Sequence, residues 1–278
     1  MTTGICALCG AFGTLRNSHY LAAAFFRRLH TNGLPPISID ATSMLYRAKQ
    51  PQAYLLCDIC ENRFKTQGED WVIDCTCSTS GGFPLRDLLL RNNPVGSMPR
   101  DVATAFWYHG ARLPEMRHSE IVYFAASVFW RGCIYDWSTV ESSLSQLQFT
   151  QELEFEFREF LLGKAAFPAS ALLQVEVAFD PAFKGQRLGI TFPSTLVPRR
   201  PTPDRGAPIG YAFAVCGITF SLYFDLGRPG GLSWGKVTSI AEPPHPLLLT
   251  DVRMSEVSAG QEALELTAVR KGRLARAR

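Results

Sequence analysis

The sequence predicts an α+β protein with a small cysteine-bearing module at its N-terminus, a helical middle and a β-rich C-terminal region. Three observations support this: two C-x-x-C pairs early in the chain, apolar residues at helical spacing between about 84 and 164, and apolar residues that alternate with polar ones from about 172 onward. We divide the chain accordingly into residues 1–80, 81–164, 165–265 and 266–278, the last being a basic tail. We expect the regions before the tail to pack into one compact unit.

The length and composition fit a globular protein. The chain has 278 residues, and 46% of them are hydrophobic, which is enough to build a sizeable core. Its longest nearly uncharged apolar stretch, Ile121–Trp130, is about half of what a membrane span needs, so we expect no transmembrane segment. The N-terminus has neither the basic start nor the apolar centre of a secretory signal, and we therefore expect a cytoplasmic location.

Positive charge is concentrated at the C-terminus. The formal net charge is +3 at pH 7, but five basic residues lie within the last nine positions, which leaves 23 basic against 25 acidic residues elsewhere. This density is typical of an arm that contacts nucleic acid, because neutralising phosphates releases counterions whatever the base sequence. The alternative is a solubilising end. The five residues are Arg270, Lys271, Arg273, Arg276 and Arg278.

Four of the eight cysteines form two C-x-x-C pairs, Cys6 with Cys9 and Cys57 with Cys60. In a reducing compartment such pairs indicate metal binding rather than disulfides. Zn²⁺ prefers four thiolate or imidazole ligands in a tetrahedron, and each pair can bring two sulfurs to one ion. The 47 residues between the pairs are too many for a simple zinc ribbon and suit a treble clef, so we predict one structural zinc ion held by the four cysteines. The alternative is that all four are ordinary buried thiols.

The segment between the two pairs is predicted to be first helical and then extended. Tyr20–His30 has the pattern of a helix, which Asn32-Gly33 and the prolines beyond it would end. Ile37–Tyr46 is predicted to be extended. After the second pair, Glu61–Lys65 favours another helix, with Phe64 facing the core.

Three helices are predicted in the middle region. Pro84 opens a short one that continues through Leu85–Leu90, since proline is favoured in the first turn of a helix. The stretch His118–Trp137 carries apolar residues at helical spacing and is predicted to be the central buried helix. The third helix is expected over Glu152–Leu162.

Strands are predicted from about Leu172, where Leu173, Val175 and Val177 alternate with polar residues. Gly217 is predicted to mark a turn between strands. The apolar residues change here from helical spacing to every second position, and we predict a β-rich region for this reason. Further apolar, β-rich runs are Leu188–Phe192, Tyr211–Phe224 and Leu247–Val252.

The remaining cysteines and the aromatic residues of the central helix have less specific interpretations. Cys75 and Cys77 form only a C-x-C, which suits spare structural thiols or a second, partial metal site. Five further residues stand among apolar neighbours and are expected in the core, although the aromatic ones share the chemistry of a base-stacking platform. These residues are Trp130, Cys133, Tyr135, Trp137 and Cys216.

Three short stretches follow one another in the N-terminal region: Cys6-x-x-Cys9, then Asn17-Ser18-His19, then Leu55-Leu56-Cys57-x-x-Cys60-Glu61. Their order resembles the HNH endonuclease family, and in particular a divergent form of its module found in a group of bacterial proteins. The resemblance covers about residues 4–75. It implies a ββα-metal core, braced by the four-cysteine zinc site, that acts on nucleic acid.

The resemblance assigns roles to two residues. His19 takes the place of the family's general base, which activates a water to attack the scissile phosphate. Glu61 stands where the family has a metal-binding histidine, and a carboxylate suits Mg²⁺ or Mn²⁺. The family's middle ligand, an Asn or His shortly before the second pair, has no counterpart. Gln52 lies five residues before Cys57, and no Asn, Asp or His lies between them.

Each of these roles has a plainer alternative. His19 could brace the loop beside the zinc site through hydrogen bonds. Glu61 could be favoured in the first turn of a helix by the helix dipole alone. Glu69 and Asp70, which follow a glycine, could extend an acidic metal site or lie in a solvated turn.

Two functions follow as hypotheses. The first is a zinc-stabilised, divalent-metal-dependent nuclease that hydrolyses phosphodiester bonds and contacts nucleic acid through Arg27, Arg28 and the basic tail. The second is a non-catalytic module in which zinc stabilises a platform for a protein partner or for nucleic acid, with Arg27 and Arg28 on a solvated helix face. Either function is compatible with a part in a bacterial defence or toxin system, which the resemblance suggests.

Overall fold

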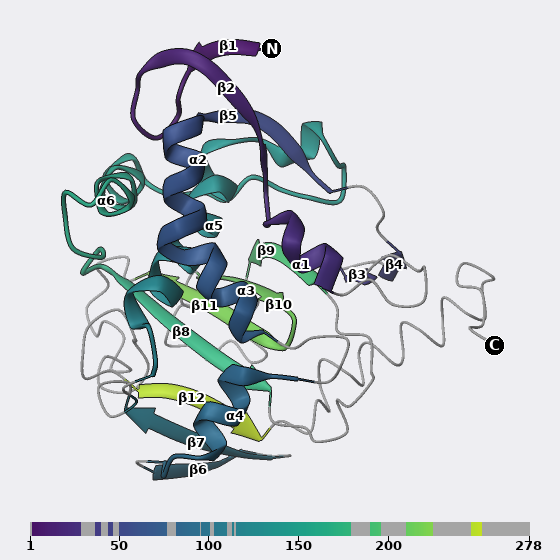
Figure 1. The fold of residues 1–278 in the computed structure, drawn as a ribbon, viewed down its shortest axis with the longest axis vertical. Coiled ribbons are helices and arrows are strands. Elements are labelled where there is room, and N and C mark those ends of the chain that lie inside the picture. The colour runs from purple at the N-terminus through teal and green to yellow at the C-terminus, as the bar shows by residue number, and fades with distance from the viewer. Residues whose placement is uncertain are drawn as a thin grey trace, which may run out of the picture.

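The computed structural model describes residues 2–28, 37–39, 44–46, 50–76, 82–94, 96–100, 103–109, 113, 115–178, 190–195, 210–224 and 246–251. These residues form helices and strands arranged around two sheets, which confirms the α+β class (Figure 1). None of the helices in the described part of the chain is both long enough and apolar enough to cross a bilayer.

The smaller sheet carries both cysteine pairs. It consists of β1 (Thr2–Ile5), β2 (Phe12–His19) and β5 (Gln52–Cys57), in the order β1-β2-β5 and with antiparallel pairing throughout. The first pair lies in and beside the turn between β1 and β2, and the second lies where β5 passes directly into α2 (Asp58–Phe64). The neighbouring strands therefore bring together cysteines that are far apart in the sequence.

Helix α2 continues without a break through η1 (Lys65–Glu69), which is π-helical, into α3 (Asp70–Cys75). The helix predicted after the second cysteine pair is thus confirmed, and Phe64 is completely buried as expected. The π-helical segment was not predicted. Such segments are rare and occur often at functional sites, because the wider turn changes the direction of the side chains.

Helix α5 (His118–Ile134) is the central buried helix. The ring of Trp130 meets Phe64 of α2 edge-on at a centroid distance of 6.1 Å. The ring of Phe124 meets Phe220 of the larger sheet at 5.4 Å, so α5 lies between the α2–α3 helix and that sheet. The predicted end at Trp137 is corrected: the chain becomes extended at Tyr135, and Trp137 starts the short η3 (Trp137–Thr139).

The larger sheet takes strands from distant parts of the chain. Within the described residues its order is β4-β3-β9-β10-β11-β8-β12-β7-β6. The pairs β3–β9 and β8–β12 are parallel, and the other neighbours are antiparallel. The strands are β3 (Ile37–Ile39), β4 (Met44–Tyr46), β6 (Gly96–Arg100), β7 (Ala103–His109), β8 (Ala171–Ala178), β9 (Ile190–Thr195), β10 (Gly210–Val215), β11 (Ile218–Phe224) and β12 (Pro246–Asp251).

Two strands correct the prediction of a purely helical middle. β6 and β7 lie within residues 81–164 and pair with each other, and β7 also pairs with β12. The pairing of β7 with the distant β12 gives the hairpin backbone partners that the local sequence does not reveal. The boundaries at residues 80 and 164 stay a prediction, while the sheet itself joins strands from all three regions.

The other predicted helices agree with the structure except at their ends. Helix α4 (Pro84–Leu90) begins at the proline, and α6 (Gln151–Leu161) is capped by the Thr150 side chain, which accepts a hydrogen bond from the Leu153 N–H. Helix α1 (Ala23–Arg28) begins later than predicted, because the Tyr20 N–H still bonds the Pro51 carbonyl and prolongs the β2–β5 ladder. The predicted end of α1 at His30 lies outside the described residues.

The turn between β10 and β11 is the one predicted at Gly217. Cys216 and Gly217 both have positive φ, 49° and 86°, as a two-residue hairpin turn requires. Cys216 and Trp130 are buried in the core as expected, as is Trp137. Cys75 is a half-buried free thiol. Cys77 and the basic residues Arg270–Arg278 lie outside the described part of the chain.

Candidate metal cluster and adjoining cavity

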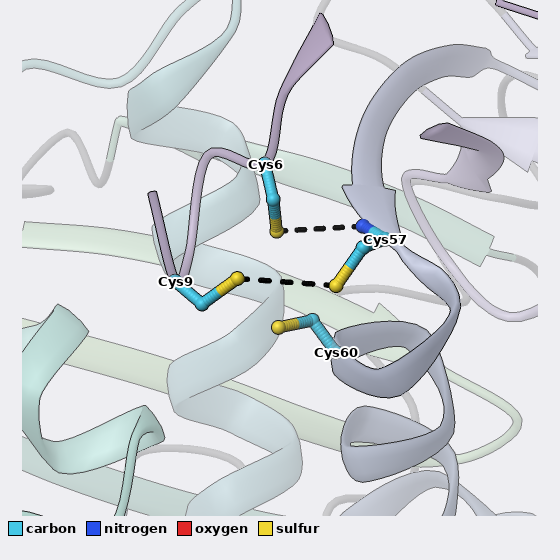
Figure 2. A group of neighbouring side chains, drawn as sticks. All are labelled: Cys6, Cys9, Cys57 and Cys60. Atoms are coloured by element: carbon cyan, nitrogen blue, oxygen red, sulfur yellow. Dashed lines mark hydrogen bonds between the residues drawn. The ribbon is translucent and has the colours of Figure 1, made fainter. Parts of the chain in front are cut away.

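The four predicted cysteines lie together. The sulfur atoms of Cys6, Cys9, Cys57 and Cys60 are all within 4.8 Å of one another, and Figure 2 shows them converging from the β1–β2 turn and the start of α2. Cys6 and Cys60 are buried, Cys57 is half-buried and Cys9 is exposed. The Sγ atoms of Cys9 and Cys57 are 3.9 Å apart. The structure therefore contains a four-thiol cluster that could hold a metal ion.

The first pair is held by a tight backbone turn. The Cys6 N–H bonds the Ala11 carbonyl at 2.8 Å, and the Gly10 N–H bonds the Cys6 carbonyl at 2.9 Å. Gly10 has φ of +76°, which a residue with a Cβ rarely adopts. The turn also bonds β5, because the Ala7 N–H reaches the Leu55 carbonyl at 3.0 Å. As a result, the sulfur atoms of Cys6 and Cys9 both point toward Cys57 and Cys60.

The second pair is positioned by the start of a helix. Cys57 is the N-cap residue of α2, and its own N–H points to the Cys6 sulfur at 3.3 Å. Cys60 lies one turn further along α2, so both sulfurs lie on the side of the helix that faces the turn. Helix α6 braces the cluster from outside, because Arg158 Nε donates to the carbonyl of the buried Leu8 at 3.0 Å.

The electrostatics of the cluster favour a bound cation. Burial opposes ionisation of Cys6, but hydrogen bonds from the backbone N–H groups of Cys9, Cys57 and Leu8 outweigh it and lower the pKa of Cys6 to about 7. Burial raises the pKa of Cys57 and of Cys60, and the neighbouring Cys6 adds to both effects. One thiolate therefore forms readily, whereas further thiolates need a positive ion among them.

The ligand set fits a tetrahedral soft-metal site. Metal–sulfur bonds of about 2.3 Å place tetrahedral sulfurs roughly 3.8 Å apart. The observed limit of 4.8 Å means that side-chain adjustments of about an ångström would complete the shell. Cys75 and Cys133 are free thiols outside the cluster.

A cavity of about 200 Å³ adjoins the other end of the β2–β5 ladder. It is lined by both residues to which the resemblance assigned a catalytic role, His19 and Glu61, together with three cationic and two further acidic side chains. Its size suits a phosphate group with a hydrated ion rather than a whole nucleotide. The lining residues are His19, Ala22, Ala23, Ala24, Arg27, Glu61, Lys65, Glu69, Asp70, Ile73 and Arg131.

His19 ends β2 and is held by a chain of two amides. It is paired with Gln52 in the ladder, and Gln52 Nε2 lies 2.5 Å from His19 Nε2. Asn17 Nδ2 in turn donates to Gln52 Oε1 at 2.6 Å. His19 Nε2 is therefore engaged by Gln52. The resemblance left Gln52 without a role, and the structure places it against the imidazole.

Burial lowers the pKa of His19 below its ordinary value of 6.5. The negative charges of Glu61 and Glu69 raise it, and the positive charges of Arg131 and Arg27 lower it, but burial has the largest effect. The neutral imidazole, which can accept a proton, is therefore the favoured form near neutral pH.

Two of the three acidic groups in the cavity are already paired. Glu69 Oε1 accepts from Arg131 Nη2 at 2.7 Å, and Asp70 Oδ2 accepts from Lys65 Nζ at 2.7 Å. Glu69 is 8% exposed, which corrects the interpretation of this residue as part of a solvated turn. Glu61 Oε1 is buried and has no hydrogen-bond partner among the described residues. Glu61 is thus the carboxylate that remains for a cation.

The two arginines predicted to contact nucleic acid differ. Arg27 is exposed and lines the cavity. Arg28 donates to the Asp74 carbonyl at 3.4 Å and forms a long ion pair with the same residue at 4.0 Å. Only Arg27 is placed to meet a group bound in the cavity.

Sequence reasoning missed Arg131. It lies on α5, within a stretch that is otherwise apolar, and its guanidinium reaches back to η1. A charged residue in the buried face of a predicted helix was the available signal, because such residues need partners or a function.

Comparison of the chain with protein-family models, with curated proteins and with solved structures finds no match.

Proposed function

We propose that the protein is a metal-dependent phosphodiester hydrolase acting on nucleic acid, with a structural zinc ion at the four-cysteine cluster. The observation that carries the proposal is the presence of His19 and Glu61 in one cavity, with a buried Glu61 oxygen that has no partner among the described residues. One residue can accept a proton and the other can bind a cation, and these are the two abilities that metal-assisted hydrolysis requires.

The order of elements supports the narrower assignment to an HNH-like treble clef. A turn with one cysteine pair, a strand that ends in His19, a second strand and a helix that begins with the other pair follow one another in the chain. Glu61 directly follows Cys60 on that helix, so the zinc site and the cavity share a helix. A zinc ion at the cluster would fix the start of α2 and thereby the position of Glu61.

The donor set also fits a divalent cation. Mg²⁺ and Mn²⁺ are commonly held by one or two carboxylates, with water and substrate phosphate completing the shell. Glu61 would provide the carboxylate, and the bound ion would stabilise negative charge on the phosphate oxygens. Glu69 and Asp70 are engaged by Arg131 and Lys65, and for this reason Glu61 is the ligand that we assign.

His19 supplies the base. The oxygen of a water molecule bonds to phosphorus, its proton passes to His19 Nδ1, and the P–O ester bond breaks, with the leaving oxygen taking a proton from solvent. For Nδ1 to accept a proton, Nε2 must carry one and donate it to Gln52 Oε1. Turning the Gln52 and Asn17 amides over exchanges donor and acceptor without moving the heavy-atom positions.

The test is cleavage of labelled single-stranded and duplex DNA and RNA by the zinc-loaded protein with Mn²⁺ or Mg²⁺. We expect His19→Ala and Glu61→Gln each to lower the rate roughly 100-fold to 10,000-fold while zinc content stays unchanged. The matched control is His118→Ala, because His118 lies at the start of α5 and outside the cavity. No cleavage of any substrate by the wild type, or wild-type rates from His19→Ala, would contradict the proposal.

A second candidate, a non-catalytic zinc-stabilised binding module, is favoured by one observation. Ile5 and Phe12 face each other across the β1–β2 ladder and are 69% and 77% exposed. Apolar side chains that lie exposed next to one another are a feature of surfaces that bind a protein partner. On this alternative, Ile5→Ser with Phe12→Ser abolishes function in cells and His19→Ala does not, whereas the hydrolase requires the reverse.

A further inference from the structure

Arg131 is the most deeply buried charged group of the cavity. Its side chain is 2% exposed, although the residue lines the cavity beside His19. A buried guanidinium must satisfy its donors, since each unpaired one loses the hydrogen bonds that water would provide. Nη2 donates to Glu69 Oε1 at 2.7 Å, and Nη1 reaches the Tyr20 carbonyl at 3.5 Å. Arg131 Nε is buried and has no acceptor among the described residues.

The surrounding structure holds this guanidinium in place. It lies over the Phe64 ring at 4.7 Å from the centroid, which fixes its plane. Glu69 comes from the π-helical segment, and the neighbouring Gly68 lies so close to α5 that a Cβ there would be 2.7 Å from the Phe124 nitrogen. The close approach of these two helices sets the Glu69–Arg131 pair, and among the described residues Nε is the guanidinium nitrogen of Arg131 that has no hydrogen-bond partner.

We propose that Arg131 and Arg27 form an anion subsite of the cavity that binds a phosphate group, with Arg131 Nε–H donating to a non-bridging oxygen. This inference rests on the proposed function for the nature of its substrate, a phosphodiester. It assigns different tasks to two groups near His19: Glu61 attracts the cation, and Arg131 donates a hydrogen bond to the phosphate oxygen. A planar guanidinium with a free N–H is the group that best matches a tetrahedral oxyanion.

The charges around His19 agree with this division. The electrostatic effects on the pKa of His19 come from Glu61, Arg131, Glu69 and Arg27, so carboxylates and guanidinium groups both lie near the imidazole. Lys65 also lines the cavity, but Asp70 already pairs with it and its side chain is 60% exposed. Arg27 is exposed and has the charge to guide an anion toward the buried Arg131.

The experiment measures binding of inorganic phosphate to the full-length, zinc-loaded protein without Mg²⁺ or Mn²⁺, at constant ionic strength set with potassium chloride. Titration calorimetry gives the affinity. We expect Arg131→Lys, which keeps the charge and loses the planar fork, and Arg27→Gln each to weaken binding roughly tenfold or more. Arg91→Gln is the matched control, because Arg91 is exposed, pairs with Glu115 and lies outside the cavity.

A second measurement needs no variant. In the nitrogen-15 spectrum of the wild type, the Arg131 Nε–H resonance is expected to shift on addition of phosphate and to stay in place with chloride. This readout keeps the proposal testable if Arg131→Lys fails to fold. An unshifted Nε–H resonance, or wild-type affinity in a folded Arg131→Lys, overturns the anion subsite.

The same titration separates this inference from the proposed hydrolase. Glu61→Gln is expected to bind phosphate at least as tightly as the wild type, because it removes a negative charge from the cavity and no anion contact. Phosphate binding without any cleavage would end the hydrolase proposal and keep the subsite. Cleavage that depends on His19, without phosphate binding at Arg131, would do the opposite.

Discussion

The two ends of the β2–β5 ladder carry two sites of different design. At one end Cys57 stands opposite Leu15 and belongs to a cluster of four thiols that could hold a metal ion. At the other end Gln52 stands opposite His19, beside a cavity whose acidic and basic groups come from β2, α1, the continuous α2–η1–α3 helix and α5. Identical soft ligands define one chemical task. In the cavity, some acidic and basic groups form ion pairs with one another. Which group is left to bind a substrate or a cation therefore depends on which ion pairs form in the folded chain.

The two sites also differ in what they do for the protein: the cysteine cluster holds the start of α2, and the cavity carries the side chains that we propose to be reactive. α2 begins in the cysteine cluster and carries Glu61 into the cavity, so the second site depends on the first. The dependence runs one way, since the cluster is complete without the cavity. Perturbing the cysteines should therefore disable both sites, whereas perturbing the cavity should leave the metal cluster intact.

The largest effect is expected from Cys57→Ser, which removes one of the four thiols and leaves a good N-cap residue at the start of α2. Metal content should fall from one equivalent to none, and the free energy of unfolding should drop by several kcal/mol, because metal-binding energy of roughly 10 kcal/mol or more is folding energy in structural sites. Metal analysis and urea unfolding measure both. Cys75→Ser, outside the cluster, should keep its metal. Full metal content in Cys57→Ser would refute the four-cysteine site.

Gly68→Ala should disturb the packing of η1 against α5 beside the cavity and leave the cysteine cluster unchanged. An added Cβ would lie 2.7 Å from the Phe124 nitrogen and 3.1 Å from the Glu120 carbonyl oxygen, and backbone atoms cannot easily move. We expect a loss of about 1–3 kcal/mol in unfolding free energy with metal content unchanged. Gly13→Ala is the control, because a Cβ at Gly13 meets nothing within 4 Å. Metal loss in Gly68→Ala would show that the two ends are not separable.

Gln52 tests how the imidazole is oriented. Removing it in Gln52→Ala should lower the cleavage rate about tenfold, the value of one hydrogen bond of roughly 1.4 kcal/mol. Gln52→Glu can only accept, so it should retain activity and move the pH profile upward, because a carboxylate beside His19 raises its pKa. Rates and pH profiles of both variants check this. An inactive Gln52→Glu would contradict the assignment of Nδ1 as the base.

The smallest expected effect is in pH dependence. Burial lowers the pKa of His19 below 6.5, so the cleavage rate should rise with pH through a midpoint under 6.5 and level off above it. The pKa of His19 is lower in the folded state than in the unfolded state. At pH values between these two pKa values, the unfolded state therefore binds more protons than the folded state. The contribution to stability is therefore complete above pH 6.5 and is lost as pH falls. A rate midpoint above 6.5 that depends on His19 would contradict burial as the dominant effect.

Much of the cysteine end was predictable because its information is local. Each C-x-x-C is a short turn whose sulfurs converge without help from the rest of the chain, and the spacing of apolar residues predicted α5 and α6. The resemblance pointed to His19 and Glu61, and the structure places both in one cavity. The β6 and β7 strands were not predicted, because the hairpin that they form joins the sheet through pairing of β7 with β12, far along the chain.

By itself the sequence determined the membership of the four-thiol cluster and the main buried helix, since both depend on residue type and short-range periodicity. Only the tertiary structure decided which carboxylate of Glu61, Glu69 and Asp70 has no cationic partner among the residues that the structure describes. That choice depends on Arg131 crossing from α5 to η1, a contact between residues 62 positions apart. The pattern of apolar residues fixes which faces are buried, but pairing among buried charges is settled by packing at close range.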